Sequence, residues 1–241
     1  MSQDSQATPI PLAADRPKAR ARWGRRLVRW TGTLLILAGV LGLAWVATIV
    51  LWQDPFTALY AKRAQSQLST QYEERVRTIE PTLTAPAVKR LPLATVAHRF
   101  QAATHVGQPI GKLSVPRMGL NAVVVYGTDH ESLKKGPGLD PRTHMPGEGQ
   151  LVYVAGHRTT YLAPFSHIDR LQPGDVIRLT TPYATFTYHV TSHVIVPSTD
   201  IDRLKSRGVE ELALQACHPR FFATQRYIVY AHLRSVKRAD A

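Results

Sequence analysis

The chain has 241 residues, of which 44% are hydrophobic and 20% charged, a composition that excludes wholesale disorder and allows one ordinary domain plus additional segments. Thirty Lys and Arg against 17 Asp and Glu give a net charge of +13. Basic and acidic groups number seven and two in residues 1–53, seven and four in residues 54–108, and sixteen and eleven in residues 109–241. Because the excess is spread out and forms no basic stripe, we expect no nucleic-acid partner.

The chain has a single cysteine, Cys217. One cysteine excludes an intrachain disulfide and any zinc or iron–sulfur site that needs several thiolates. No spacing of His, Asp and Glu stands out as a metal site either, so we expect no metal and no cofactor. The cysteine is then either an inert buried side chain or a nucleophile, and its surroundings must decide.

An uncharged segment near the N-terminus covers residues 30–52, with Trp30 and Trp52 at its ends. Its 23 residues would span about 34 Å as a helix, enough for a hydrocarbon core of about 30 Å. Seven basic residues precede the segment, so the positive-inside rule predicts a cytoplasmic tail over residues 1–29. A cleaved signal peptide fits less well, because its apolar core is shorter and ends in small residues. We expect a single-pass anchor in the cell membrane, with residues from 54 onward extracytoplasmic.

Residues 53–108 divide into a helical part and a linker. Residues 55–77 are rich in Ala, Leu, Gln, Glu and Arg, with apolar residues near helical spacing, which predicts a juxtamembrane helix that acts as a spacer. Residues 78–95 contain three prolines and no clean period, so we expect a linker there. A short helix is expected over residues 96–104.

Residues 109–238 have the pattern of a β domain, in which short runs alternate between apolar and polar residues and are separated by Pro, Gly and Asp. Seven or eight strands in about 130 residues predict a closed or nearly closed barrel. The strands are expected at residues 110–117, 121–127, 150–155, 175–181, 184–196, 211–217 and 226–236. Short helices are expected at 132–135, 163–171 and 200–206, and residues 239–241 form a C-terminal tail.

The run at residues 184–196 has the clearest alternation in the chain. Five apolar side chains, from Phe186 to Val196, are expected on one face of a half-buried strand.

Cys217 and Arg226 are expected to face each other across two paired strands. Pro219 stops the strand that contains Cys217, which places the thiol near the strand end and the barrel mouth. The eight residues between Cys217 and Arg226 favour an antiparallel pair, in which opposed Cα atoms lie about 4.5–5.5 Å apart. The alternative is that Arg226 pairs with a surface carboxylate such as Glu210 or Glu211.

His157 also follows a predicted strand, after Ala155 and Gly156, whose lack of bulk allows close approach of another group. His218 is the rival imidazole, but neighbouring residues on a strand point to opposite faces, so it should turn away from Cys217. Cysteine, histidine and arginine together suit acyl transfer, with a thiolate nucleophile, an imidazolium proton donor and a guanidinium that binds an oxyanion. An ordinary surface histidine remains the alternative for His157.

Several motifs in order resemble the sortase family, most closely the class E enzymes of actinobacteria. They are VAGHRTT at residues 154–160 with APF at 163–165, LQPGD at 171–175, and ALQACHP at 213–219 with Arg226. The resemblance covers residues 109–238 and implies an eight-stranded sortase barrel with His157, Cys217 and Arg226 at the three active-site positions.

The resemblance implies a transpeptidase that cleaves a C-terminal sorting signal of the LPxTG or LAxTG kind between Thr and Gly. A thioester would then pass the surface protein to an amine of a peptidoglycan precursor or a pilin. The family pattern TLxTC reads ALQAC here, so Ala213 and Ala216 replace two threonines. A silent module that only binds sorting peptides or pilins, and a structural envelope protein that binds anionic lipid or wall polymer, are the alternatives.

Overall fold

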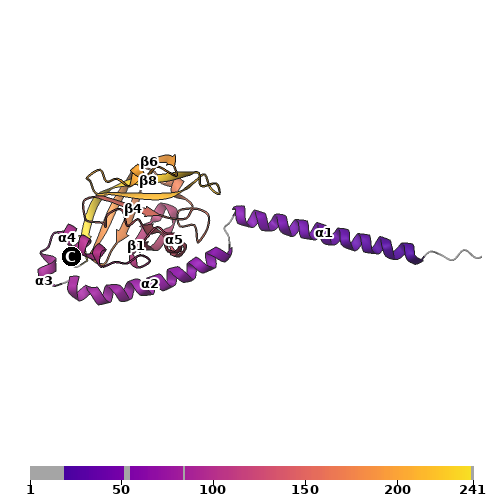
Figure 1. Cartoon of the computed structure of the whole chain (residues 1–241), viewed down its shortest axis with the longest axis horizontal. Helices are drawn as coiled ribbons and strands as arrows, with labels where there is room; N and C mark the ends of the chain where they lie inside the picture. Colours follow the sequence, from indigo (N-terminus) through magenta and orange to yellow (C-terminus); the bar gives the residue numbers. More distant parts are fainter. Residues whose placement is uncertain (1–18, 52–54, 84, 240–241) are drawn as a thin grey trace, which may run out of the picture. The chain divides into compact units, whose positions relative to one another are not determined.

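The computed structural model describes residues 19–51, 55–83 and 85–239 (Figure 1). Residues 1–18 of the predicted basic tail, Trp52 at the end of the predicted anchor, and the last two residues of the tail lie outside the described residues. The chain divides after Val50 into two compact units, which are described separately.

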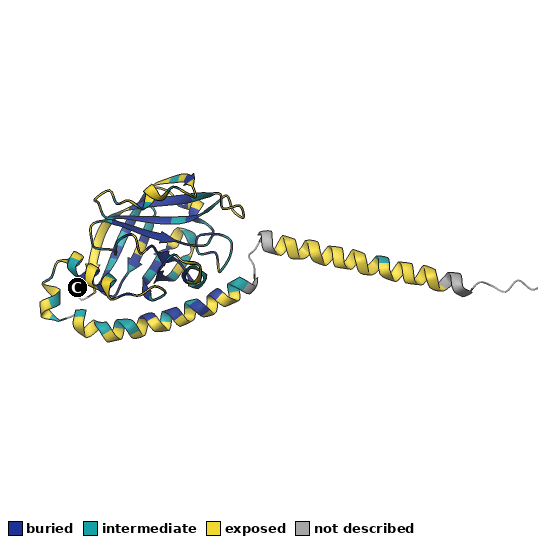
Figure 2. Ribbon diagram, viewed as in Figure 1, coloured by how far each residue is buried: buried dark blue, intermediate teal, exposed yellow. Residues whose placement is uncertain are grey.

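The described part of the first unit is a single long helix, α1, Ala19–Leu51, whose last residue begins the second unit. Its stretch Trp23–Thr48 is long and apolar enough to cross a membrane, and nearly all of its side chains are exposed (Figure 2). The hydroxyls of Thr31 and Thr48 donate hydrogen bonds to backbone carbonyls one turn earlier, at Leu27 and Ala44. These polar groups are therefore satisfied within the helix, as a hydrocarbon environment requires.

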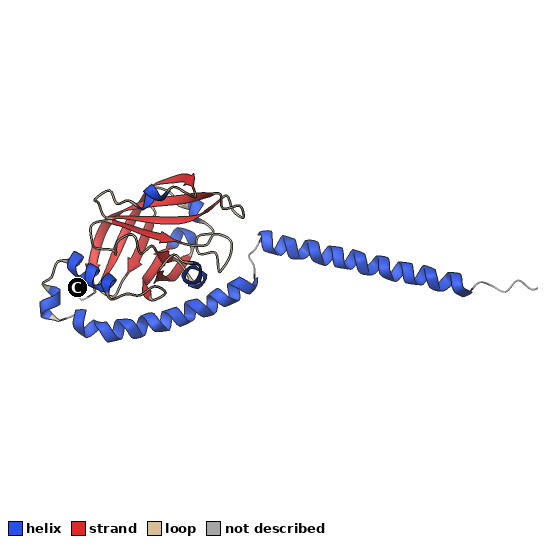
Figure 3. Cartoon of the chain, viewed as in Figure 1, coloured by secondary structure: helices blue, strands red, loops and turns tan. Residues whose placement is uncertain are grey.

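The second unit contains a closed barrel of eight strands in the order β1-β2-β3-β4-β7-β8-β6-β5, which confirms the predicted barrel. Figure 3 shows the strands in red. Strand alternation fills its interior with fully buried apolar side chains, while the alternate residues face outward. The strands are β1 Pro109–Val115, β2 Leu120–Tyr126, β3 Gly138–Leu139, β4 Leu151–Ala155, β5 Val176–Thr180, β6 Ala184–Pro197, β7 Glu211–His218 and β8 Gln225–Arg238.

The prediction missed β3, because two residues cannot display a period. The helix expected at residues 132–135 is α5, His130–Lys135, and Asp129 caps it by accepting a hydrogen bond from the backbone N–H of Ser132. Single 3₁₀ turns, η1 Pro116–Met118, η2 Ile168–Arg170 and η3 Ile201–Leu204, complete the domain. The helix expected over 163–171 is wrong apart from η2, because Tyr161, Leu162 and Ala163 take left-handed conformations.

The prediction that the apolar residues of β6 share one face is wrong beyond Val190. Val190 pairs with Ala231 of β8 and the next pair is Ser192 with Tyr230, so β6 carries one extra residue at this point. Such a bulge turns the following side chains to the opposite face. Val190 accordingly packs in the barrel interior, whereas Val196 packs on the outside, in the cluster that contains Tyr230.

Helix α2, Pro55–Leu83, packs along the barrel and is not the spacer that the sequence predicted. Ala61, Ala64, Leu68 and Tyr72 recur every three or four residues and are buried as one stripe. The stripe covers β1, β2 and α5, and Leu68 and Tyr72 pack with Val123 and Val125 of β2. The sequence showed the helix but gave no partner for its apolar face.

The linker expected at residues 78–95 is also wrong. Helix α2 continues to Leu83 although Pro81 lies inside it, two residues before its end, where a proline removes one backbone hydrogen bond. The helices α3, Pro86–Lys89, and α4, Leu93–Ala102, follow, and α4 buries Val96, Ala97 and Phe100 against the barrel.

Gln65 fixes the middle of α2 to the barrel. Its amide nitrogen donates to the carbonyls of Val123 and Lys135, at 3.1 and 2.7 Å, and its amide oxygen accepts from the N–H of Val123 at 2.8 Å.

Replacing Gln65 with Ala leaves these backbone groups without that partner, and we expect the free energy of unfolding to fall by about 1–3 kcal/mol. Chemical denaturation of the full chain in detergent measures it, with the exposed Gln67→Ala as the control. Equal stability of the two variants would show that α2 does not depend on this contact.

Candidate active site

Three adjacent strands bring distant parts of the chain to one place. Strand β4 runs parallel to β7 with Ala155 opposite Gln215, and the N–H of Gly156 continues the ladder by donating to the carbonyl of Gln215 at 2.9 Å. Strand β8 runs antiparallel to β7 with Arg226 directly opposite Cys217. This register confirms the predicted pairing of Cys217 with Arg226 and sets His157 level with Cys217 in the next strand.

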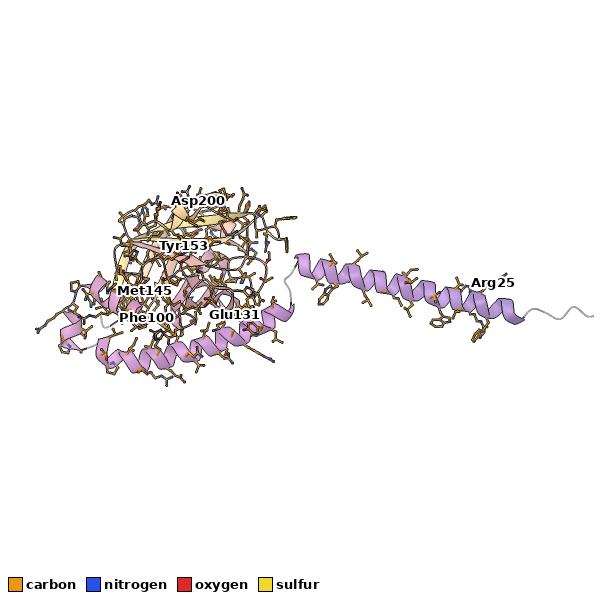
Figure 4. All side chains as sticks on the ribbon, in the orientation of Figure 1. Arg25, Phe100, Glu131, Met145, Tyr153 and Asp200 are labelled. Atoms are coloured by element: carbon orange, nitrogen blue, oxygen red, sulfur yellow. The ribbon has the colours of Figure 1, made fainter. Side chains whose placement is uncertain are left out.

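His157, Cys217 and Arg226 line one pocket of about 300 Å³. Tyr153 and Asp200, both labelled in Figure 4, are also among its lining residues. The pocket lies over the outer face of the barrel, because residues 213, 215 and 217 alternate with Leu212, Leu214 and Ala216, which face the interior. The expected position at the barrel mouth is therefore wrong, although Cys217 is the penultimate residue of β7.

Close packing behind Gly156 fixes the backbone at His157. A Cβ atom on Gly156 would come within 2.7 Å of the ring of Phe165, and the N–H of Phe165 donates to the carbonyl of His157 at 3.0 Å. The absence of a side chain at Gly156 thus allows close approach, as predicted, and the group that approaches is Phe165.

The imidazole of His157 is largely buried. Burial, followed by the positive charge of His130, lowers the pKa of His157 below its usual 6.5, because both disfavour the charged form. Its Nε2 is buried and accepts or donates no hydrogen bond within the part of the chain that the structure describes. His157 thus lines the pocket while its Nε2 is closed off from solvent and has no partner among the described residues.

Cys217 and Arg226 are both half-buried, so the thiol is accessible from the pocket. The guanidinium of Arg226 donates to the carbonyls of Ala223 and Gln225, at 2.8 and 3.0 Å. Among the described residues it pairs with no carboxylate. Glu210 and Glu211, the alternative partners, are engaged elsewhere.

Glu210 accepts from the backbone N–H groups of Gly147 and Gly149 and from the hydroxyl of Tyr188. Glu211 pairs with Arg207 and with His232. The alternative interpretation of Arg226 as one half of a surface ion pair is therefore wrong, and its remaining donors are available to the pocket.

Arg158 is a site residue that the sequence analysis missed. It is 4% exposed and reaches behind β7, where its guanidinium lies 3.4 Å from the carbonyl of Cys217 and 3.0 Å from Nδ1 of His218. It also pairs with Asp169 at 3.2 Å and lies over the ring of Tyr227. Because guanidinium has only donors, Nδ1 of His218 must accept this hydrogen bond.

His218 consequently turns away from the pocket, as its position next to Cys217 predicted. Little in the sequence indicates this position for Arg158, because an arginine next to a histidine has the same pattern as an ordinary surface arginine.

Asp140 and Arg142 form a second pair in the pocket wall that the sequence analysis missed. Asp140 is buried, and although burial raises its pKa, hydrogen bonds from the side chain and backbone of Arg142 lower the pKa below its usual value. Their closest contact is 2.7 Å, and Thr128 donates to the same carboxylate. The pocket wall thus contains an ion pair of Asp140 with Arg142, and also the guanidinium of Arg226, which pairs with no carboxylate among the described residues.

The two alanines of the ALQAC segment lie on opposite faces of β7, and both are fully buried. Ala216 packs in the barrel interior, and Ala213 packs outside with Tyr153, Ile228 and Tyr230. A hydroxyl at either position would need a hydrogen-bond partner, and alanine removes that requirement. No group of three His, Cys, Asp or Glu is placed to hold a metal ion in residues 19–51, 55–83 and 85–239.

Comparison with known families decides what this barrel is. The model of the sortase domain family matches residues 113–234, slightly more than half of the chain. The chain belongs to the sortase family. The resemblance read from the motifs around His157, Cys217 and Arg226 is thereby confirmed.

Relatives of this sortase include both class D and class E enzymes. Sortase D of Bacillus subtilis is 34% identical over 128 residues, which are 52% of this chain and 63% of that one. Sortase SrtE1 of Streptomyces coelicolor is 26% identical over 96% of this chain and 65% of its own length. The chain thus spans somewhat less than two thirds of each of these two relatives.

Solved structures agree with the fold. Sortase E of Streptomyces avermitilis, at 32% identity, superposes with a TM-score of 0.50 over 56% of this chain and 94% of that chain. Sortase C of Clostridium perfringens, at 23% identity, gives a TM-score of 0.58 over 70% of this chain and 99% of that one, which supports the fold alone.

The lowered pKa of His157 makes stability depend on pH. Below about pH 6.5 the unfolded chain takes up a proton at this imidazole more readily than the folded chain, so acid favours unfolding. We expect the stability advantage of the wild type over His157→Gln to shrink as the pH falls from 7.5 to 5. Denaturant unfolding of both proteins measures it, and His98→Gln, at an exposed helical position, is the control. An advantage that grew on acidification would mean that the folded site prefers the imidazolium.

Proposed function

We propose that this sortase is a membrane-anchored cysteine transpeptidase that cleaves a C-terminal sorting signal between Thr and Gly and joins the protein to a cell-wall amine. The observation that carries the proposal is the convergence of Cys217, His157 and Arg226 on one pocket of a sortase barrel. Substrates of the LPxTG or LAxTG kind follow from the resemblance to class E enzymes.

In the first step, the thiolate of Cys217 attacks the carbonyl carbon of the substrate Thr and forms a C–S bond. The carbonyl oxygen becomes an oxyanion, and Arg226 supplies a positive donor directly across the strand pair. The C–N bond to Gly then breaks, and the imidazolium of His157 gives its proton to the departing amine. A thioester on Cys217 and a neutral imidazole remain.

In the second step, the acceptor amine attacks the thioester carbonyl. A C–N bond forms, the C–S bond breaks, and the amine loses a proton to His157, which restores the starting state of the enzyme. We propose an amine of a peptidoglycan precursor or of a pilin as the acceptor.

The proposed first step needs an imidazolium at His157, whose burial lowers its pKa and disfavours that charged form. No hydrogen bond joins His157 to Cys217 among the described residues, and Arg226, directly opposite Cys217, is the positive group that the proposal places beside the nucleophile.

Helix α1 supports the proposed location. Its length and apolar surface suit a membrane span, and the basic residues before residue 30 favour a cytoplasmic N-terminus. The barrel would then face the cell wall, where sorting signals and acceptor amines are present.

Cleavage of sorting peptides by the full chain in detergent tests the proposal. We expect release of the C-terminal fragment after Thr from quenched LPxTG or LAxTG peptides, and no release by Cys217→Ala. Arg226→Lys should lower turnover by about 100-fold, because a point charge does not replace a planar set of donors.

Arg234→Lys, at an exposed position on the same strand, is the matched control for Arg226→Lys. Cleavage that persisted in Cys217→Ala would overturn the assignment of the nucleophile. Peptide binding without cleavage would instead support the silent binding module, the alternative that Ala213 and Ala216 favour.

A further inference from the structure

Tyr161 joins the start of α2 to the imidazole of His157. Its ring centroid lies 5.1 Å from that of His157, tilted by 37°, and 6.2 Å from that of Tyr60, in an edge-to-face arrangement. Its backbone N–H donates to the hydroxyl of Thr57 at 3.1 Å. Thr57 and Tyr60 belong to the first two turns of α2, about 100 residues earlier in the chain.

The backbone around Tyr161 adopts a conformation that needs support. Tyr161, Leu162 and Ala163 have φ values of 51°, 62° and 40°, in the left-handed region that side chains other than glycine rarely take. Hydrogen bonds from the N–H of Ala163 to Thr160 and from the N–H of Phe165 to His157 close the loop on itself. Consecutive residues of this kind persist only where the surroundings hold them, and the contact from α2 is part of those surroundings.

The start of α2 is itself firmly placed. Ala61 and Ala64 are buried against the barrel, and Gln65 is hydrogen-bonded to the backbone of β2 and to the end of α5. The helix can therefore serve as a fixed support for the loop that carries Tyr161.

We propose that the first two turns of α2 are a structural part of the active site, in which Thr57 and Tyr60 hold Tyr161 and Tyr161 holds the imidazole of His157 against the pocket. The catalytic consequence rests on the proposed function, in which His157 transfers the proton. Tyr161, Thr57 and Tyr60 are positioning residues, since they act on the reaction through His157.

This arrangement makes the segment directly after α1 a determinant of turnover. Helix α1 ends at Leu51 and α2 begins at Pro55, so the residues that support the catalytic loop follow the apolar helix almost immediately. A sortase domain without the start of α2 would retain Cys217 and Arg226 on their strand pair but would lose the support for its imidazole.

The test is the double variant Thr57→Val/Tyr60→Ala in the full chain in detergent. Hydrogen exchange of residues 158–166 should become about tenfold faster, while exchange in β7 and β8 stays the same. The turnover number should fall by about tenfold to a hundredfold with little change in KM, because a misplaced proton donor slows chemistry more than binding. Leu59→Ala, which removes an exposed side chain from the same turns, is the matched control and should behave as the wild type.

Two variants of Tyr161 distinguish the effect of its ring contact from the effect of its backbone conformation. Tyr161→Phe keeps the ring contact and should retain the turnover of the wild type, whereas Tyr161→Gly, which suits φ 51°, removes the ring and should match the double variant. The proposal would be overturned if hydrogen exchange of residues 158–166 and the turnover number were both unchanged in Thr57→Val/Tyr60→Ala. If the wild type cleaves no sorting peptide, the proposed function fails, and the exchange measurement alone still decides whether α2 supports the loop.

Discussion

The site depends on the pairing of three strands whose residues come from distant parts of the chain. Parallel pairing of β4 with β7, in the register Ala155 opposite Gln215, sets His157 level with Cys217, and antiparallel pairing of β7 with β8 sets Arg226 opposite Cys217. A shift of one residue in either pair would turn one of the three groups to the barrel interior. The apolar residues that alternate with them, including Leu214 and Ala216, are fully buried and resist such a shift.

Two arginines lie on either side of the strand that carries Cys217, the nucleophile of the proposed reaction. Arg226 has its donors free of carboxylates on the pocket side, and Arg158 is buried behind the strand with its charge shared between Asp169, His218 and the carbonyl of Cys217. Burial lowers the pKa of His157, which favours the neutral imidazole that the proposed second step needs as a proton acceptor.

The sequence predicted the barrel and the three pocket residues because alternation, strand-ending proline and the spacing of two strands are local signals. Cys217 and Arg226 needed only one hairpin, and His157 needed the family motif that surrounds it. The bulge in β6 escaped prediction because an inserted residue leaves the alternation of the letters intact while it reverses the faces. The contacts of α2, Arg158 and Tyr161 escaped prediction because they join segments 59 to 104 residues apart, which no local pattern encodes.

Trapping of the acyl-enzyme tests the central claim most directly. The full chain in detergent is mixed with a sorting peptide, quenched in acid within the first turnovers and digested, and the peptide that contains Cys217 is identified by mass spectrometry. The account predicts an added mass equal to the substrate up to and including Thr, less one water, attached to Cys217 and removed by hydroxylamine. Peptide cleavage with Cys217 unmodified, or with the acyl group on another side chain, would contradict it.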